Sequence, residues 1–222
     1  MLRLASGAFY FAVWFKVNKV KGKKLKTKEV NSKLRILPPQ ALSRGPNSKL
    51  IFILGGARSG KSAYALKLAE SIPVKRLYLA TAEALDGEMA KRIKKHRKDR
   101  GNNWTTIEEP IRIVDVIAKD KKHAVILLDC LTLWVSNIIH KKSGVRSQKS
   151  EVIYKTVNQF ISACKKAKAN IIVVSNEVGL GIVPDNPLAR EFRDIAGYAN
   201  QKIAEAADEV YFVTVGIPVK IK

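Results

Sequence analysis

The stretch Gly55-Gly56-Ala57-Arg58-Ser59-Gly60-Lys61-Ser62 fits G-x-x-x-x-G-K-[ST], the pattern of a phosphate-binding P-loop. A short apolar run with β-branched residues precedes it at 50–54, and a run of helix-forming residues follows it at 63–71. A strand, a glycine-rich loop and a helix in this order allow backbone N–H groups and the positive helix N-terminus to face the phosphates. The alternative is a chance glycine loop, which the two flanking elements disfavour.

Three polar residues are candidates for the chemistry of a bound nucleotide. Lys61 can reach the β- and γ-phosphates, and Ser62 can ligate Mg²⁺. The apolar run 123–129 ends in Asp129, which is the form of the second nucleotide-site strand, whose carboxylate lies near the metal ion. We therefore expect a nucleoside triphosphate with Mg²⁺ here, although the motif alone does not specify the second substrate.

Segments with strand and helix character alternate along the rest of the chain. The expected strands lie at 50–54, 76–81, 123–129, 170–175 and 209–215, with an extended segment at 104–109 and a short last strand at 217–221. The expected helices lie at 63–71, 89–100, 110–117, 131–139, 151–167 and 187–207, with Pro110 and Pro187 opening theirs. This alternation predicts an α/β fold of three layers in one domain at 49–222, with a mostly parallel central sheet between helices.

Residues 1–48 differ from the rest of the chain, and we expect them to lie outside the folded domain. Residues 1–50 hold 12 Lys and Arg against the single acid Glu29, which is half of the net charge of +22. The apolar run 4–15 is too short to span a bilayer and is a poor secretory signal. Three interpretations stay open: a basic, disordered extension, a membrane-surface anchor, or an upstream start codon that is not the natural one. We favour the first and the third.

The basic composition favours anionic partners such as nucleotides, nucleic acid or anionic lipid. The alternative is a basic proteome or a basic tail without any partner, and we favour that alternative for the tail. A nucleic-acid-binding ATPase is one alternative, but aromatic residues make up only 7% of the chain and are not interleaved with the basic runs as stacking platforms would be. We therefore expect no nucleic-acid partner. Cys130 and Cys164 form neither a metal pattern nor a disulfide framework, so we expect packed thiols in a reducing cytoplasm.

His96 is a candidate nucleophile because of its surroundings in the basic run 91–100. Nearby cations disfavour the imidazolium form, a neutral imidazole is nucleophilic, and histidine does form covalent intermediates. The same cations can hold the phosphates of a group being transferred. The alternative is an exposed histidine on a solvated basic helix.

Several longer stretches besides the P-loop form a recognisable series. They are Tyr78–Glu83, then Glu88-Met89 leading to Arg92-Ile93 and His96-Arg97, Leu127–Asn137, Ser175–Pro184 followed by Leu188–Arg190, Phe192–Gly197 and Asn200-Gln201, and at the end Gly216-Ile217 and Val219–Lys222. Together they resemble the bifunctional adenosylcobinamide kinase / adenosylcobinamide-phosphate guanylyltransferase family of cobalamin biosynthesis. The resemblance covers about residues 49–222 in order, and Ser175–Pro184 is far more specific than a P-loop. Residues 1–48 have no counterpart in the family.

The resemblance implies a two-step enzyme with a RecA-like P-loop fold that assembles as a trimer. In the first step, ATP or GTP phosphorylates the hydroxyl of the aminopropanol arm of adenosylcobinamide. In the second, GTP gives GMP to a histidine, which here is His96, and releases pyrophosphate. Adenosylcobinamide phosphate then takes the GMP, and the product is adenosylcobinamide-GDP.

The resemblance also assigns residues to roles. His96 would be the guanylylated catalytic residue, beside the catalytic Lys61 and the Mg²⁺ ligands Ser62 and Asp129 that the motif and the acidic strand end already indicate. The implied nucleotide contacts are Gly55, Gly56, Ala57, Arg58, Ser59, Gly60, Lys61, Ser62, Ala63, Ala80, Thr81, Ala82, Arg97, Lys98, Asp99, Arg100, Glu108 and Asp129. The remaining alternative is a P-loop kinase of another small molecule, in which His96 has no role.

Overall fold

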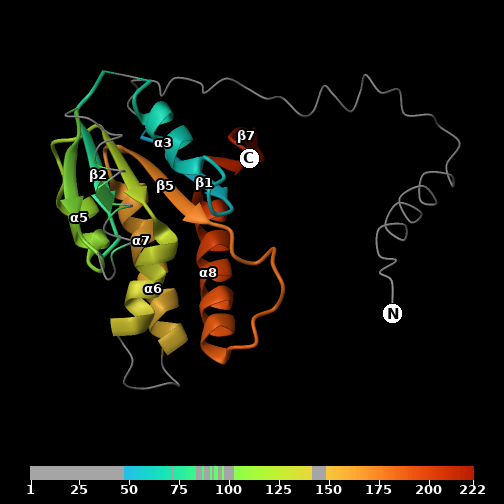
Figure 1. Cartoon of the computed structure of the whole chain (residues 1–222). Coiled ribbons are helices and arrows are strands. Elements are labelled where there is room, and N and C mark those ends of the chain that lie inside the picture. The colour runs from blue at the N-terminus through green and yellow to red at the C-terminus, as the bar shows by residue number, and fades with distance from the viewer. Residues whose placement is uncertain are drawn as a thin grey trace, which may run out of the picture. The chain divides into compact units, whose positions relative to one another are not determined.

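The computed structural model describes residues 48–71, 73–83, 103–141 and 149–222, together with Gly87, Lys91, Ile93, Lys94 and Arg97. Within these residues, one seven-stranded sheet has the order β3-β2-β4-β5-β1-β6-β7. Figure 1 labels β1, β2, β5 and β7 of this sheet. The strands are β1 (Leu50–Gly55), β2 (Arg76–Ala80), β3 (Thr105–Glu108), β4 (Val125–Asp129), β5 (Asn170–Asn176), β6 (Glu209–Thr214) and β7 (Ile217–Lys220).

Every strand pair in the sheet is parallel except β6 with β7, which is an antiparallel hairpin. The P-loop strand β1 lies between β5 and β6, and β5 separates β1 from β4. The carboxyl ends of β1, β4 and β5 therefore meet at one edge, where ligands of open α/β sheets bind.

Alternating residues of the strands point to opposite faces of the sheet, and each face has its own helices. Phe52 packs in a cluster with side chains of four helices, whereas Ile51 and Ile53 pack with the helix that follows the P-loop. Among the elements that can be bounded in the described residues, the helices that cover the sheet are α3 (Lys61–Ala69) on one face, and α5 (Ile113–Lys119), α6 (Leu131–Lys141), α7 (Lys149–Lys166) and α8 (Pro187–Ala206) on the other. The predicted three-layer α/β fold with a mostly parallel sheet is confirmed.

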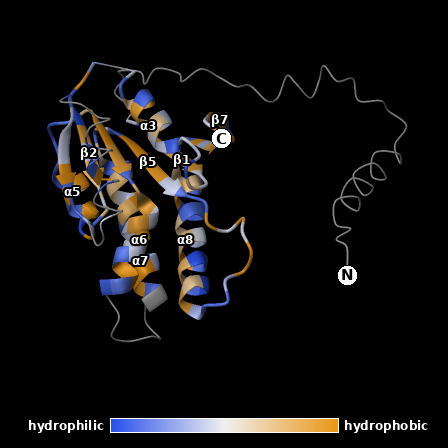
Figure 2. Cartoon of the chain, viewed as in Figure 1, coloured by the Kyte–Doolittle hydropathy of each residue, from blue (hydrophilic) through white to orange (hydrophobic). Residues whose placement is uncertain are grey.

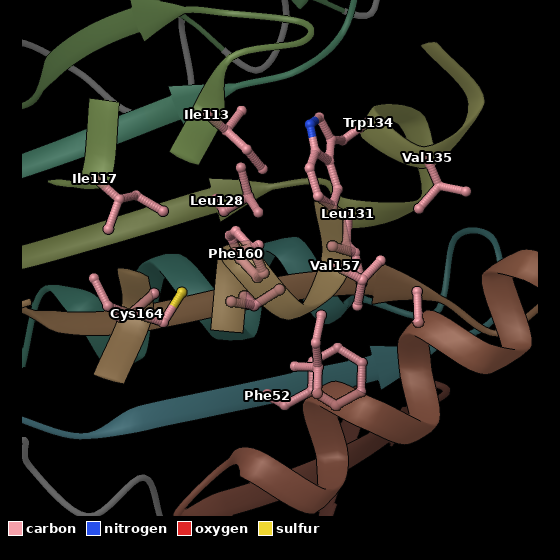
Figure 3. Close-up of a cluster of buried hydrophobic side chains, with 14 of the residues drawn as sticks. Phe52, Ile113, Ile117, Leu128, Leu131, Trp134, Val135, Val157, Phe160 and Cys164 are labelled. Atoms are coloured by element: carbon pink, nitrogen blue, oxygen red, sulfur yellow. The ribbon is translucent and has the colours of Figure 1, made fainter. Parts of the chain in front are cut away.

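The larger core cluster forms around Trp134 of α6, which is fully buried (Figure 3). Its ring lies 5.4 Å from that of Phe160 on α7, centroid to centroid, and its Nε1 donates a 2.8 Å hydrogen bond to the carbonyl of Ile111. The polar end of the indole is thus satisfied inside an apolar cluster. This contact ties α6 and α7 to the segment that leads into α5.

The start of α5 differs from the sequence prediction. The helix begins at Ile113 rather than at Pro110. The reason is the side chain of Glu109, whose Oε1 accepts hydrogen bonds from the backbone N–H groups of Ile111 (3.0 Å) and Arg112 (2.8 Å). These bonds hold a turn ahead of the helix, and they lower the pKa of Glu109 although its partial burial acts in the opposite direction.

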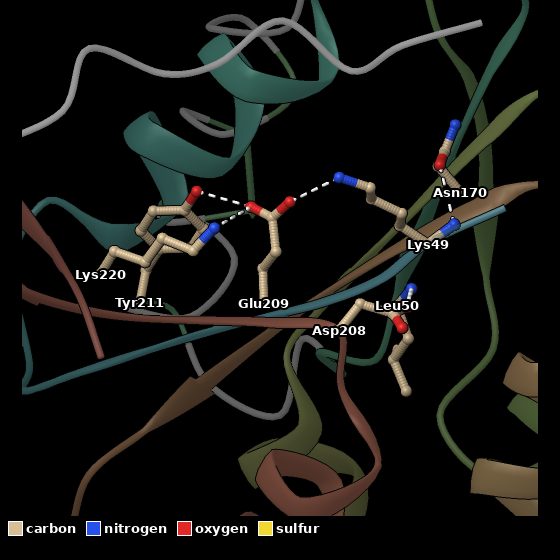
Figure 4. A network of polar contacts seen from close by, with 7 residues as sticks. All are labelled: Lys49, Leu50, Asn170, Asp208, Glu209, Tyr211 and Lys220. Carbon is tan, nitrogen blue, oxygen red and sulfur yellow. Dashed lines mark hydrogen bonds and ion pairs between the residues drawn. The ribbon is translucent and has the colours of Figure 1, made fainter. Parts of the chain in front are cut away.

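A polar network fixes the chain at its entry into β1 (Figure 4). Lys49 donates from its backbone N–H to Asn170 Oδ1 (2.9 Å) and from Nζ to Glu209 Oε1 (2.7 Å). Glu209 also accepts a hydrogen bond from the Tyr211 hydroxyl at 2.7 Å and pairs with Lys220 at 3.3 Å. The entry to β1 is therefore linked to β5, β6 and β7 before the first core residue.

Both cysteines are buried free thiols, as predicted. Burial raises the pKa of the Cys130 thiol to about 12, and it also raises the pKa of Cys164, so neither is a reactive thiolate. Figure 2 shows mostly apolar residues along the central strands and a mixture of polar and apolar residues along the helices. Within the described part of the chain, no helix is long and apolar enough to cross a bilayer.

Candidate nucleotide site

The phosphate-binding loop begins where β1 ends, and Gly55 is required there by close packing. A Cβ atom at Gly55 would lie 2.4 Å from the carbonyl oxygen of Val213 and 2.6 Å from Ser59 Oγ. The Ser59 Oγ is buried and has no hydrogen-bond partner among the described residues. A buried hydroxyl without a partner inside a glycine-rich loop fits a ligand that accepts or donates hydrogen bonds, as a phosphate does.

The glycine at the end of the loop, Gly60, has a φ of 92°, which favours glycine over other residues. It is the N-cap of α3, and its carbonyl accepts the hydrogen bond from Tyr64 N (3.0 Å) that opens the helix. The turn of the β6–β7 hairpin packs against this point, because a Cβ at Gly60 would lie 3.1 Å from the Cα of Gly216. The loop therefore leads directly into a helix N-terminus, which attracts anions.

Lys61 is the first residue of α3, and its side chain folds back across the loop. It is 8% exposed, and Nζ donates a 3.0 Å hydrogen bond to the carbonyl of Gly56. A lysine in this position spans the concave side of the loop, where the phosphates of a nucleotide would lie. Ser62, the predicted metal ligand, follows in the first turn.

Asp129 lies at the carboxyl end of β4, as the sequence predicted. Its Oδ2 accepts a 2.7 Å hydrogen bond from the hydroxyl of Tyr78 on the neighbouring strand β2. The described residues contain no group of three or more His, Cys, Asp or Glu side chains that could hold a metal ion alone. Mg²⁺ fits this arrangement, because it binds through one or two protein oxygens, such as those of Asp129 and Ser62, plus phosphate oxygens and water.

Thr81 joins the ends of β2 and β4 instead of presenting its hydroxyl to solvent. Its Oγ1 donates to the carbonyl of Cys130 (2.7 Å) and accepts from the backbone N–H of Cys130 (2.9 Å). The carbonyl of Thr81 accepts a 2.8 Å hydrogen bond from Asn137 Nδ2 on α6. Residues 80–82 are predicted nucleotide contacts, but the side-chain hydroxyl of Thr81 forms its hydrogen bonds with the backbone of Cys130.

The structure brings together two predicted nucleotide contacts that are distant from the P-loop in sequence. Arg97 Nη2 forms an ion pair with Glu108 at the end of β3, and both side chains are about half exposed. His96, Lys98, Asp99 and Arg100 lie outside the described residues. Arg97, which belongs to the basic segment, therefore lies at the carboxyl edge of the sheet, beside the end of β3.

A chain of buried polar side chains lies behind the site, and sequence reasoning missed it. Thr132 Oγ1 lies 3.0 Å from Ser175 Oγ, which donates a 2.8 Å hydrogen bond to Asn200 Oδ1. Thr132 lies in the first turn of α6 just after β4, Ser175 is the next-to-last residue of β5, and Asn200 comes from α8. The available signal was weak, because α6, β5 and α8 each hold other polar residues and nothing in the sequence singles out these three.

The segment between β5 and α8 leaves the same edge and arches away from the body of the domain (Figure 1). The backbone N–H of Glu177 donates a 3.0 Å hydrogen bond to the carbonyl of Gly55. Further on, Leu180, Ile182 and Val183 are 82%, 97% and 57% exposed. Apolar side chains held in solvent beside a phosphate site are typical of a surface that another molecule covers.

The family model described as cobinamide kinase / cobinamide phosphate guanyltransferase matches residues 51–221. The bifunctional adenosylcobalamin biosynthesis protein CobU of Escherichia coli (strain K12) is 42% identical over 182 residues, which is 78% of this chain and 99% of the relative. The bifunctional adenosylcobalamin biosynthesis protein CobP of Pseudomonas aeruginosa (strain PAO1) is 39% identical over 171 residues, 77% of this chain and 95% of the relative.

Two solved structures are similar at a lower sequence identity than these relatives. The RadB recombinase gives a TM-score of 0.43 with 14% identity, covering 74% of this chain and 73% of its own. The second solved structure, an ATPase domain, gives a TM-score of 0.44 with 14% identity, covering 94% of this chain and 84% of its own.

Proposed function

The chain belongs to the cobinamide kinase / cobinamide phosphate guanyltransferase family, and we propose that its substrates are adenosylcobinamide, ATP or GTP, and Mg²⁺. It is a bifunctional enzyme of cobalamin biosynthesis. In this proposal the acceptor is the hydroxyl of the aminopropanol arm, and the final product is adenosylcobinamide-GDP. The observation that supports it best is the joint placement of Lys61, Asp129 and the end of β5 at one edge of the sheet.

In the kinase step, the acceptor oxygen attacks the γ-phosphorus and a new P–O bond forms. The bond from that phosphorus to the β,γ-bridging oxygen breaks, the nucleoside diphosphate leaves, and the hydroxyl proton passes to solvent. Lys61 counters the charge on the β- and γ-phosphates, and the amides of the loop orient them. Mg²⁺, held by Asp129 and Ser62, would neutralise part of the charge on the leaving diphosphate.

In the guanylyl step, an imidazole nitrogen of His96 attacks the α-phosphorus of GTP, and pyrophosphate leaves as the P–O bond breaks. A phosphate oxygen of adenosylcobinamide phosphate then attacks the same phosphorus, and the P–N bond to His96 breaks. A covalent intermediate of this kind divides one difficult transfer into two easier ones. The ion pair of Arg97 with Glu108 supports a place for this basic segment beside the bound nucleotide.

The test of the histidine intermediate is incubation with α-labelled GTP and Mg²⁺, followed by mass spectrometry. We expect one GMP adduct on His96, labile in acid and stable in base, as a phosphoramidate is. His96→Asn should remove the adduct and the guanylyl step while leaving phosphorylation largely intact, because direct transfer to a hydroxyl needs positioning rather than a protein nucleophile. His123→Asn is the matched control, since His123 is tied to Asp120 and Thr105. An adduct on another residue would overturn the assignment.

The same experiment separates the main alternative, a P-loop kinase of another small molecule. That enzyme would bind the nucleotide at Lys61 and transfer its γ-phosphate without labelling His96. It would also leave adenosylcobinamide unphosphorylated. The two enzymes therefore differ in whether His96 carries a GMP label and in whether adenosylcobinamide is phosphorylated.

We also propose that the enzyme works in the cytoplasm, as a homotrimer without nucleic acid, and that residues 1–47 are not needed for it. The hydroxyl of Ser48 donates a 2.7 Å hydrogen bond to the carbonyl of Ala167, so we place the boundary one residue before the one expected from the sequence, which put residues 1–48 outside the domain. Deleting 1–47 should leave both activities and the melting temperature nearly unchanged, measured beside the full chain. Loss of solubility or activity would show that the extension belongs to the working enzyme.

A further inference from the structure

Asn176 occupies the most central position of the phosphate edge. It is the last residue of β5, the strand that lies between the P-loop strand and the strand that ends in Asp129. In the sheet register it pairs with Gly55, the first residue of the P-loop. A side chain at this point lies between the phosphate loop and the carboxylate that would hold the metal ion.

The backbone of Asn176 is fixed from both sides by buried polar side chains. Its N–H donates a 2.6 Å hydrogen bond to Thr132 Oγ1, and its carbonyl accepts one of 3.2 Å from Asn200 Nδ2. Ser175 Oγ links the two, since it lies 3.0 Å from Thr132 Oγ1 and donates to Asn200 Oδ1 at 2.8 Å. Thr132, Ser175 and Asn200 are 5%, 1% and 6% exposed.

Such a network is informative because buried polar groups stabilise a fold little unless every member is satisfied. Apolar side chains of the same size would fill the space as well. Thr132 and Asn200 bond to the two backbone groups of Asn176, and Ser175 connects them, so their joint effect is to hold Asn176 in one orientation. Precise positioning of this type is expected around groups that act on a substrate.

The side-chain amide of Asn176 keeps capacity to donate. It is partly exposed, and its Nδ2 contact among the described residues is the sulfur of Cys130 at 4.0 Å, which is a weak acceptor. Because Cys130 directly follows Asp129, this contact places the amide beside the end of β4, where Asp129 would hold the metal ion. A neutral donor here can contact a phosphate oxygen without competing with Lys61 for charge.

We propose that Asn176 donates a hydrogen bond from Nδ2 to the terminal phosphate of the bound nucleoside triphosphate, and that Thr132, Ser175 and Asn200 are the residues that position it. The effect on phosphorylation rests on the proposed function, whereas the effect on nucleotide binding can be measured with the nucleotide alone. The contact would orient the γ-phosphoryl group for in-line attack, and it would tighten as charge develops on that group.

The first test compares Asn176→Ala and Asn176→Asp with wild type. For Asn176→Ala we expect the kcat of phosphorylation to fall about 10-fold or more, with the KM for nucleotide changed less than about threefold, because the bond strengthens in the transition state. Asn176→Asp should lose more, since a carboxylate cannot donate and repels the phosphate. Asn170→Ala, at the other end of the same strand, should keep kcat within about twofold.

A binding measurement keeps this test independent of the corrinoid. The ratio of the Kd for GDP to the Kd for a non-hydrolysable GTP analogue should fall in Asn176→Ala, because the amide touches only the terminal phosphate. If the ratio falls in Asn176→Ala but wild type does not phosphorylate adenosylcobinamide, the proposed function fails and the Asn176 contact stands. Unchanged kcat and an unchanged ratio in both Asn176 variants would overturn the contact.

The positioning role is tested with an isosteric pair. Thr132→Val removes the hydroxyl and keeps the shape, whereas Thr132→Ser keeps the hydroxyl. We expect Thr132→Val to lower kcat about 3- to 10-fold and Thr132→Ser to restore it, and we expect Thr132→Val to have no further effect in an Asn176→Ala background. Additive effects of the two changes, or a loss in Thr132→Val that tracks the melting temperature alone, would overturn the positioning role.

Discussion

The backbone N–H of Gly216 donates a 2.8 Å hydrogen bond to the carbonyl of Ser59, so the turn of the C-terminal hairpin supports the phosphate-binding loop. Gly216 has a φ of 82° and Val215 a φ of 45°. Two consecutive residues with positive φ form the tight turn that joins β6 to β7. The last strand of the sheet thus contributes to the site through its turn rather than through a side chain.

Val215 is a poor residue for that turn, and replacing it should stabilise the domain. A β-branched residue is strained at positive φ, and Val215 is 84% exposed, so it loses few buried contacts on substitution. Asn-Gly is the preferred pair in such turns. Val215→Asn should raise the free energy of unfolding by about 1 kcal/mol, measured by urea denaturation.

Val215→Thr is the control for the Val215→Asn prediction, because threonine adds polarity but keeps the branched Cβ. It should change the stability little. Nucleotide affinity should be unchanged in both variants, since the hydrogen bond to Ser59 comes from the Gly216 backbone. A gain in Val215→Thr equal to that in Val215→Asn would show that polarity, rather than strain, limits the turn.

Lys61→Ala should abolish both activities, because Lys61 would contact phosphates in either reaction. We expect turnover to fall about 100-fold or more in each assay, together with weaker GTP binding by titration calorimetry. Lys67→Ala is the matched control, since Lys67 is an exposed lysine on the same helix. Tight GTP binding and normal turnover in Lys61→Ala would contradict the nucleotide-site assignment.

The P-loop and Asp129 could be predicted because their signals are local. The first is a spacing within eight neighbouring residues, and the second is an acid at the end of an apolar run. The hydrogen bonds between distant residues around the site could not be predicted. Tyr78 and Asp129 are 51 residues apart in sequence, and Thr132 and Ser175 are 43 apart. A single polar residue in an apolar segment does not indicate which distant residue it meets.

The start of α5 shows a second limit of sequence reasoning. Proline is favoured at the first position of a helix, so Pro110 was a reasonable start. The side chain of the preceding Glu109 takes the backbone N–H groups of Ile111 and Arg112 instead, and the helix begins at Ile113. Competition between a local side chain and the helix for backbone donors decided the boundary.

Tyr78→Phe should weaken the binding of Mg²⁺ more than it weakens the fold. The change removes the 2.7 Å hydrogen bond to Asp129 and keeps the buried ring, which packs edge-on to Trp104. Partners that orient a metal ligand are typically worth about 10- to 100-fold in metal affinity. We expect a rise of this order in the Mg²⁺ concentration that gives half-maximal turnover, with Tyr154→Phe on α7 as the control. An unchanged Mg²⁺ requirement would show that Asp129 needs no support from Tyr78.

Glu209→Gln should change how stability depends on acid pH. Burial alone would raise the pKa of Glu209, but the contacts from Lys49, Tyr211 and Lys220 outweigh it and hold the pKa below its ordinary value of 4.5 (Figure 4). A carboxylate with a lowered pKa stabilises the folded state above its unfolded pKa, and this contribution disappears as the pH falls through the folded pKa.

At pH 7, wild type should therefore exceed Glu209→Gln by about 1–3 kcal/mol in the free energy of unfolding, since hydrogen bonds to a charged group are lost. The difference should stay constant from neutral pH down to about 5 and shrink below the ordinary carboxylate pKa. Glu205→Gln, the same change at an exposed pair with Lys202, should show almost no difference at either pH. Urea denaturation at about pH 7 and about pH 3 checks both variants. If wild type still exceeds Glu209→Gln by the same free energy of unfolding at the acid pH, then packing of the side chain, rather than its charge, links β6 to Lys49 and β7.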